Sequence, residues 1–115
     1  MASGKYNLNI EQGARFGVQF IWKDKDGNPV DLSGFTGQIQ FREEKDSATP
    51  LYDSDTNSDI TLGPDPGSIS FNIDTPSTGG FEFDNAYYDL EMTSGGETER
   101  LLEGRVYLSK EVTRA

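Results

Sequence analysis

The residues that decide the class of fold are Phe16-Gly17-Val18-Gln19-Phe20-Ile21-Trp22. Large apolar side chains stand at every second position of this stretch, which is the period of a β-strand with one face in a core. The run 24–29, Asp-Lys-Asp-Gly-Asn-Pro, follows almost at once. Its Asp-Gly pair supplies the positive φ of a tight reversal. Strand period and turn chemistry together predict β-structure.

The same two-residue period recurs along the rest of the chain. It predicts further strands at 6–10, 35–41, 60–62, 69–73, 86–92 and 98–108. Residues 47–59 are polar and are expected to form a loop, and Thr75 with Pro76 predicts one helical turn that Thr75 caps. Seven to eight short strands without a long helix are typical of an all-β antiparallel sandwich or small barrel.

The length and composition of the chain predict one small core. The sequence has 115 residues, so residues 1–115 are expected to form a single domain. Hydrophobic residues make up 33% of the chain and aromatic residues 11%. We therefore expect a core built largely from aromatic side chains. At this size such a core is sufficient for folding without a metal or a disulfide.

The net charge of −10 limits the choice of partners. It argues against nucleic acid, since phosphate contacts need clustered Lys and Arg, and against an anionic membrane surface. Its simplest role is solubility, and its sharper interpretation is that acidic faces meet basic faces of a partner protein. No stretch has the length of a membrane span or a signal peptide, so we expect a protein made in the cytoplasm and not secreted.

The chain contains neither cysteine nor histidine. It therefore lacks thiolate chemistry, the commonest general base and the commonest transition-metal ligand. The paired carboxylates of a glycosidase need a cleft in which burial raises one pKa, whereas the acidic residues here lie mostly in turn segments. We expect no enzyme activity and no cofactor.

One acidic segment invites a metal-binding interpretation. Its residues with oxygen ligands are spaced two apart, at Asp53, Asp55, Asn57 and Asp59, as at the start of a calcium loop. However, Ser58 stands at the position of the invariant glycine, and Pro64 stands at that of the bidentate glutamate. We interpret the segment as a solvated acidic loop without a metal.

The motif Asp84-x-Ala86-x-Tyr88-x-Leu90 resembles the signature of strand F in immunoglobulin domains. The resemblance implies an immunoglobulin-like β-sandwich in which Asp84 and Tyr88 form a structural corner. The Tyr88 hydroxyl would then bond back to upstream backbone. Leu90 stands where immunoglobulins have their second cysteine, and Trp22 lies on the strand that carries their first.

A wider resemblance covers most of the chain. The segments that carry it are 6–14, 22–34, 88–92, 100–106 and 111–114. In this order they resemble a family of small virion proteins of tailed bacteriophages, similar to the N-terminal β-domains of baseplate and tail-fibre adaptor proteins. Membership would imply a structural role in the virion without catalysis. The partners would be other virion proteins, with this chain present as a homo-oligomer or in multiple copies.

Two other functions remain open at this point. Similar sandwiches also decorate capsids, so a cement protein on the phage head is the close alternative to a tail component. A carbohydrate-binding module for host recognition is the alternative from another class, and it would need an exposed aromatic platform. Both alternatives, like the leading hypothesis, require binding through surface residues.

Four aromatic residues are candidates for partner contacts because a small core does not accommodate every large ring. They are Tyr87, Phe81, Phe83 and Tyr107. If Tyr88 faces the core, the two-residue period of a strand turns Tyr87 outward. Exposed tyrosines supply contact area at low entropic cost, which suits protein–protein interfaces.

Overall fold

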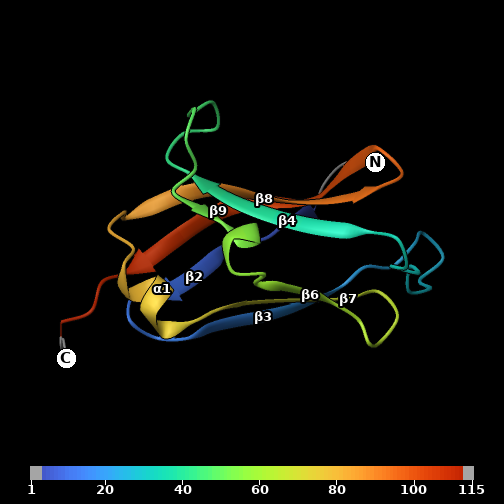
Figure 1. The fold of residues 1–115 in the computed structure, drawn as a ribbon, viewed down its shortest axis with the longest axis horizontal. Helices are drawn as coiled ribbons and strands as arrows, with labels where there is room; N and C mark the ends of the chain where they lie inside the picture. The colour runs from blue at the N-terminus through green and yellow to red at the C-terminus, as the bar shows by residue number, and fades with distance from the viewer. Residues whose placement is uncertain (1–3, 113–115) are drawn as a thin grey trace.

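The alternating segments of the sequence form two β-sheets that pack face to face, as Figure 1 shows. The computed structural model describes residues 4–112. Its strands are β1 (Gly4–Lys5), β2 (Leu8–Glu11), β3 (Phe16–Ile21), β4 (Thr36–Arg42), β5 (Tyr52–Asp53), β6 (Ile60–Leu62), β7 (Ser68–Ile73), β8 (Asn85–Ser94) and β9 (Glu97–Ser109). A 3-10 turn, η1 (Ser54–Thr56), follows β5, and a short helix, α1 (Thr75–Gly79), follows β7.

The pairing of the strands identifies the type of sandwich. The larger sheet has the order β1-β9-β8-β4-β5, with β2 also paired to β9, and the smaller sheet has the order β3-β7-β6. In an immunoglobulin domain strands B, E and D form one sheet, and strands C, F and G lie in the other. Here β3, β7 and β6 take the B, E and D places, while β4, β8 and β9 take the C, F and G places. The prediction of an all-β immunoglobulin-like sandwich is therefore confirmed.

The first strand departs from the antiparallel pattern. β1 and β2 are two segments of one edge, interrupted at Tyr6 and Asn7, and both pair in parallel with β9. Gly104 permits this pairing, because a Cβ at that position would clash with the carbonyl of Tyr6. Counted as one strand, β1 and β2 bring the described part of the chain to eight strands, within the predicted range.

One apolar core fills the space between the sheets. Phe41 of the larger sheet is fully buried, and its ring centroid lies 6.4 Å from that of Phe71 in the smaller sheet. The rings of Tyr52, Phe81 and Tyr88 surround Phe41 at 4.7, 6.1 and 6.4 Å. Burial of a side chain as large as Phe contributes about 1.5–3 kcal/mol. The aromatic cluster around Phe41 is thus a main source of attachment between the two sheets.

Two turns fix the register of the strands they join. Gly95 and Gly96 both have positive φ, 59° and 85°, as in the tight two-residue turn that matches the twist of a hairpin. They place Ser94 opposite Glu97 at the junction of β8 and β9. In the turn after β3, the Asp24 carboxylate accepts hydrogen bonds from the backbone N–H groups of Asp26 and Asn28. The turn interpretation of that acidic run is therefore confirmed.

Two local predictions need correction. The predicted loop at 47–59 contains the short strand β5, which pairs with β4. The predicted helical turn exists as α1, but its cap is Asp74 and not Thr75. The Asp74 carboxylate accepts the N–H of Ser77 at 2.9 Å, and Thr75 is already the first helical residue.

Neither of the helical segments in residues 4–112 is long and apolar enough to cross a membrane.

Candidate functional site: the outer face of the larger sheet

The outer face of the larger sheet is built by alternation along its three longest strands. On β8, Ala86, Tyr88, Leu90 and Met92 are buried in the core. Successive side chains of a strand point to opposite sides, so Tyr87 and Asp89 lie on the outer face. The same rule places Gln40 and Arg42 of β4 there, and Glu103, Arg105 and Tyr107 of β9.

A cation–aromatic stack occupies one end of this face. The register of β8 and β9 puts Tyr87 directly opposite Arg105, and the guanidinium carbon lies 4.0 Å from the ring centroid. The Lys45 ammonium approaches the same ring at 5.5 Å. Arg105 also donates through Nη2 to the side chain of Asn85. Contacts of this kind contribute about 0.5–1 kcal/mol at exposed sites and more when desolvated, so the Tyr87 ring is held in one orientation.

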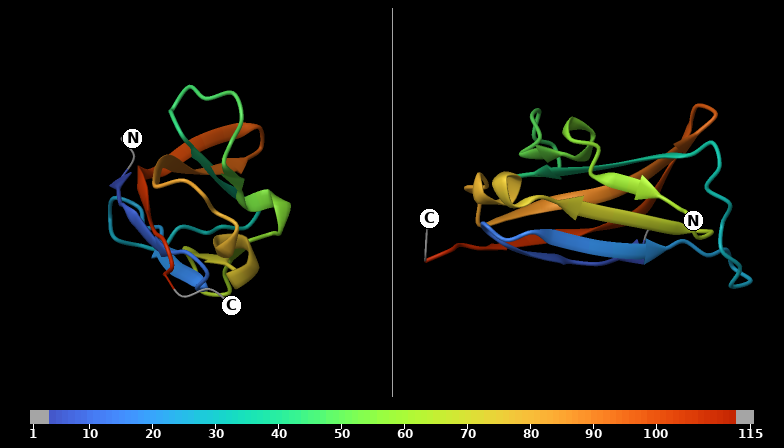
Figure 2. Two further views of the ribbon diagram at one scale, coloured as in Figure 1. Left: turned by 90° about the vertical axis from the view of Figure 1, so that its left-hand side faces the viewer. Right: turned by 60° about the horizontal axis from the view of Figure 1, so that its bottom comes forward.

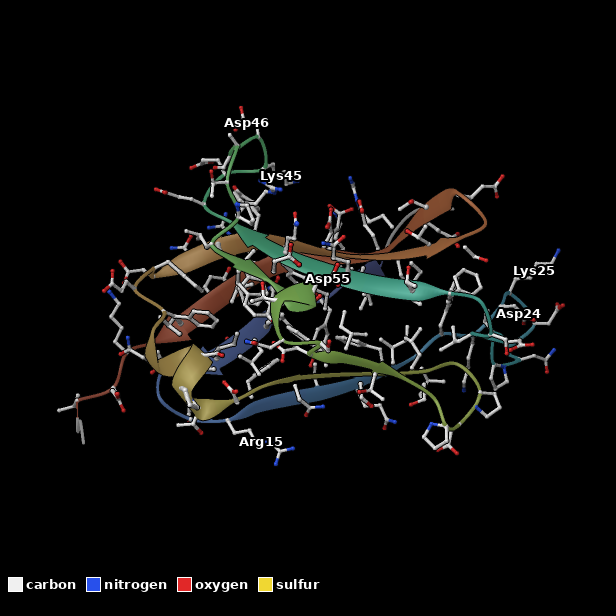
Figure 3. The ribbon with its side chains drawn as sticks, viewed as in Figure 1. Arg15, Asp24, Lys25, Lys45, Asp46 and Asp55 are labelled. Atoms are coloured by element: carbon white, nitrogen blue, oxygen red, sulfur yellow. The ribbon has the colours of Figure 1, made fainter. Side chains whose placement is uncertain are left out.

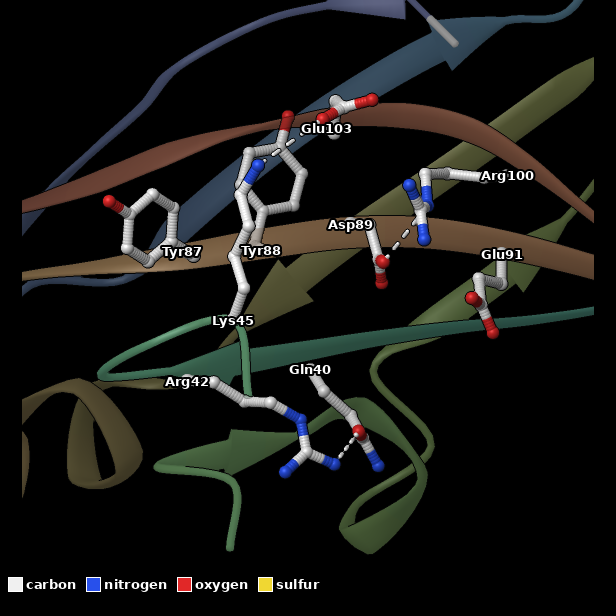
Figure 4. A pocket seen from close by; sticks show the side chains of 9 residues that line it. All are labelled: Gln40, Arg42, Lys45, Tyr87, Tyr88, Asp89, Glu91, Arg100 and Glu103. Atoms are coloured by element: carbon white, nitrogen blue, oxygen red, sulfur yellow. Dashed lines mark hydrogen bonds and ion pairs between the residues drawn. The ribbon is translucent and has the colours of Figure 1, made fainter. Parts of the chain in front are cut away.

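Ion pairs continue the face beyond the stack (Figure 4). Arg100 Nε lies 3.2 Å from Asp89 Oδ2, and Glu103 Oε1 lies 3.2 Å from Lys5 Nζ and 3.9 Å from Lys45 Nζ. Lys45, Asp89, Arg100 and Glu103 line, together with Tyr87, a shallow depression of about 290 Å³. That volume is at the lower limit for a small-molecule pocket. The depression is therefore better suited to a protruding side chain of a partner than to a whole ligand.

An amide and carboxylate network closes the other side of the face. Gln38 and Gln40 both donate to the Asp53 carboxylate, Gln40 at 2.9 Å, and the backbone N–H of Asp55 adds a bond of 3.0 Å. Partial burial disfavours the ionised form of Asp53, but these donors outweigh it and hold the pKa of Asp53 below its usual value. Arg42 in turn donates to Gln40 Oε1 at 2.7 Å. The network ties β5 and the loop after β4 to the sheet.

The basic residues of the chain gather on this face. Five of the ten Lys and Arg residues lie on it or against it: Lys5, Arg42, Lys45, Arg100 and Arg105. Only a few of the twenty acidic residues, among them Asp53, Asp89 and Glu103, share it. The face is thus close to charge balance on a chain with a net charge of −10. An acidic partner protein therefore meets less electrostatic repulsion at this face than on the rest of the surface.

The structure separates the four predicted contact residues into two pairs. Tyr87 and Tyr107 lie on the outer face of the larger sheet, and Tyr107 is 46% exposed. Phe81 is only 8% exposed and lies among Phe41, Tyr52 and Phe83, whose ring is 5.2 Å from that of Phe81. Phe83 is half-buried against the same core. The interpretation of Phe81 as a surface contact is therefore corrected, because its ring lies in the core, whereas Phe83 stays partly exposed beside it.

Tyr88 and Asp84 are not joined in one corner. The Tyr88 hydroxyl does bond to upstream backbone, but the acceptor is the carbonyl of Tyr6, at 2.5 Å, in the edge strand of the same sheet. Burial raises the pKa of Tyr88, so the hydroxyl stays protonated and remains a donor. The Asp84 carbonyl accepts the N–H of Leu108, and its exposed carboxylate pairs with Lys110 at 3.2 Å. The two residues thus anchor different segments.

The acidic segment 53–59 uses its carboxylates internally. Asp53 is the acceptor described above, and Asp59 accepts the hydroxyl of Tyr52. Burial and this bond to Asp59 raise the pKa of Tyr52. Within residues 4–112 no group of three or more acidic side chains is arranged to hold a metal ion.

Comparison with known proteins adds no assignment. No protein-family model matches the chain, and no curated protein matches its sequence. The functional argument therefore has no support from matched relatives.

The sequence interpretation missed the basic partners of the tyrosines. Arg105 lies in the strand predicted at 98–108, but its pairing with Tyr87 depends on the register of β8 and β9. The tight turn at Gly95 and Gly96 was the available signal, because a two-residue hairpin fixes that register near the turn. A register shift between Leu90 and Glu91 breaks a simple count from the turn.

Proposed function

We propose that this chain is a non-enzymatic structural protein of a bacteriophage virion. It docks onto another virion protein through the outer face of the larger sheet, in the tail, baseplate or fibre-adaptor region. The virion assignment rests on the resemblance of the sequence to small virion proteins of tailed bacteriophages. The docking face rests on the stack of Tyr87 and Arg105, which is the observation that carries the proposal.

The chemistry of the face favours a protein partner. Tyr and Arg are the residue types that dominate the binding energy of protein interfaces, where they are surrounded by contacts that exclude water. Tyr87 is held by Arg105 and Lys45 before any partner arrives, so little side-chain entropy is lost on binding. Arg105 Nε is also buried and is without a hydrogen-bond partner among residues 4–112. Such donors are normally paired, so the polar contacts of this guanidinium are incomplete within the described part of the chain.

A sugar-binding platform fits this face less well. Stacking on a sugar needs a free aromatic face, whereas the Arg105 guanidinium covers the Tyr87 ring at 4.0 Å. Tyr107 is exposed, but no other aromatic ring among residues 4–112 packs against it to extend a platform. A glycan array with the isolated domain tests this alternative, and specific sugar binding lost in Tyr107→Ala would favour it over the virion proposal.

The direct experiment follows the chain into purified particles. The variants Tyr87→Ala and Arg105→Ala are introduced into the phage that encodes the protein, with Lys25→Ala as a control in the exposed turn after β3. We expect both face variants to be depleted from gradient-purified particles by at least about tenfold, the effect of losing an interface residue worth more than 1.4 kcal/mol. The control is expected to be incorporated normally.

Two outcomes contradict separate parts of the proposal. Absence of the wild-type chain from purified particles contradicts a virion role. Normal incorporation of folded Tyr87→Ala and Arg105→Ala contradicts the docking face. Quantitative staining of the same particles distinguishes a tail component, present in few copies, from a head decoration protein, present in many.

A further inference from the structure

The strand β3 has an open edge in the smaller sheet. Trp22 donates its N–H to the carbonyl of Gly67, directly after the last pair of β3 and β7. Because hydrogen-bonded and non-bonded pairs alternate in an antiparallel ladder, the N–H and C=O groups of Gly17, Gln19 and Ile21 point away from β7. None of these groups has a hydrogen-bond partner among the described residues. β3 is the place at which immunoglobulin domains pair strand B with strand A.

The inner side of β3 is incompletely covered as well. The partner residues Ile69, Phe71 and Ile73 on β7 are fully buried, whereas the inward side chains of β3 are only half-buried. β2 and β3 run along the same side of the sandwich without pairing, as the turned views in Figure 2 show. A groove lies between β2 and the start of β3, with Ile10, Arg15 and Phe16 among the residues that line it. Further along β3, Tyr6, which is 47% exposed, packs edge-on against the ring of Phe20 at 5.6 Å. A further strand on the β3 edge would bury this apolar surface.

The charges around the edge define what it would accept. The six residues of β3 are uncharged, but Arg15 precedes the strand and Lys23 follows it, and both are exposed. Arg15 and Lys23 lie an even number of positions from Gly17, Gln19 and Ile21. Because side chains alternate along a strand, all five residues face the outer side. Figure 3 shows Arg15 pointing away from the sandwich. Neither basic side chain forms an ion pair with any of residues 4–112, although the sequence has twice as many acidic as basic residues.

A second copy of the chain fits this edge poorly. Two β3 edges that pair antiparallel about Gln19 would set Arg15 of one copy opposite Lys23 of the other, twice. Like charges directly opposite each other across a sheet are destabilising, so both contacts would oppose the pairing of two copies. An extended segment with acidic residues opposite Arg15 and Lys23 is attracted at the two positions where a second copy would be repelled.

We propose that β3 accepts an extended acidic segment of a partner protein as an additional strand of the smaller sheet. The backbone of the segment pairs with Gly17, Gln19 and Ile21, and two of its carboxylates, eight positions apart, face Arg15 and Lys23. Backbone pairing supplies the affinity in this mode of recognition, and the flanking charges supply the specificity. The edge lies on the opposite sheet from the docking face around Tyr87, so the two proposals can fail separately.

The probe is a short capped peptide of alternating Val and Thr that carries one Asp near each end, eight positions apart. Its matched control replaces both Asp residues with Lys. Amide hydrogen exchange, followed by NMR on the whole chain, reports on Gly17, Gln19 and Ile21. We expect the acidic peptide to protect these three amides and to bind on the order of tenfold more tightly than the Lys peptide, since two cross-strand charge pairs change sign.

Two sets of variants assign the effect to the edge. Arg15→Glu combined with Lys23→Glu is expected to reverse the preference between the two peptides. Gln19→Pro removes an N–H that points to the open edge and leaves the β7 ladder intact, a position at which proline is tolerated. It should abolish peptide protection of Gly17 and Ile21. Gln19→Ala, which loses the same side-chain bond to Ser68, should retain it. Tyr87→Ala should bind the peptide as the wild type does.

Several results would overturn the proposal. It fails if neither peptide protects the three amides up to its solubility limit, or if both bind equally. It also fails if sedimentation shows a wild-type dimer whose β3 amides are already protected, because the occupant would then be a second copy. In that case Lys23→Glu should tighten the dimer by turning a like-charge pair into an opposite one.

Discussion

The outer face of the larger sheet and the outer face of the smaller sheet expose different kinds of side chain. The larger sheet presents ion pairs, the stack of Tyr87 on Arg105 and most of the paired basic residues. The smaller sheet presents uncharged residues such as Gln19, Ser70 and Asn72, and ends in the open edge of β3. One sheet is therefore prepared to bind through side chains and the other through its backbone. Side chains alternate between the two sides of the strands in both sheets, but the residues that this alternation places outside differ. The two outer faces therefore have separate binding chemistries.

The largest expected effect tests whether inward side chains of the larger sheet are more deeply buried than those of β3 in the smaller sheet. Phe41→Ala in the larger sheet removes the fully buried ring at the centre of the aromatic cluster. We expect a loss of about 3–5 kcal/mol in the free energy of unfolding. Phe20→Ala on half-buried β3 should cost less than half of that. Urea unfolding of both variants measures the two losses, and equal losses would show that β3 is as well covered as β4.

The next effect concerns the attachment of the edge strand to the larger sheet. Tyr88→Phe removes the hydroxyl that donates to the Tyr6 carbonyl and breaks this partly buried hydrogen bond. The expected loss is about 1–2 kcal/mol in the free energy of unfolding. Tyr107→Phe, whose ring is exposed, is the matched control and should stay within about 0.5 kcal/mol of the wild type. If Tyr88→Phe and Tyr107→Phe unfold at the same urea concentration, the hydrogen bond to Tyr6 does not stabilise the attachment of β1 and β2 to the larger sheet.

The strands of both sheets could be predicted from the sequence where alternation was long. The stretches around Phe16 and Ala86 alternate over several residues, and each became a strand with the expected face inward. β5 could not be predicted, because two residues inside a polar run contain no period. Phe81 and Phe83 lie in an irregular segment, so no pattern indicated that their rings close the core.

The site was predictable in part. The outward position of Tyr87 followed from the inward position of Tyr88, but its stack on Arg105 needed the pairing register between β8 and β9. The acceptor of the Tyr88 hydroxyl lies 82 residues away in sequence, so no local motif could identify it. The open edge of β3 was equally hidden, since which strand lacks a neighbour depends on the order of strands in the finished sheet.

A smaller effect is expected in the pH dependence of stability, through Asp53 in the larger sheet. In the folded chain the pKa of Asp53 lies below its usual value of about 3.9. The stabilisation is therefore fully present above that pH and is lost as the pH falls through the lower folded pKa. Asp53→Asn should flatten the decline of stability below about pH 4, measured by urea unfolding at successive pH values. Asp46→Asn, in an exposed loop, should leave the decline unchanged. An unaltered decline in Asp53→Asn would contradict the role of the network with Gln38 and Gln40.

The smallest effect compares a paired cation with an unpaired one. Arg100 pairs with Asp89 on the larger sheet, whereas Arg15 beside the smaller sheet pairs with no described residue. A double-mutant cycle of Arg100→Gln and Asp89→Asn should give a coupling of about 0.2–1 kcal/mol that decreases at high salt. Arg15→Gln should change stability by less than about 0.5 kcal/mol at any salt concentration. A comparable loss in Arg15→Gln would mean that this side chain has a partner in the folded chain.

The parallel pairing of the first and last strands also determines how the domain would bear mechanical load. β1 and β2 run beside β9 in the same direction, from the pair of Gly4 and Leu102 to the pair of Glu11 and Ser109. Gly4 and Ser109 therefore lie at opposite ends of this parallel ladder, along which β2 and β9 run side by side in Figure 1. Tension between them slides the two strands past each other and loads every hydrogen bond of the ladder together. An antiparallel edge pulled from the same end would open one bond at a time.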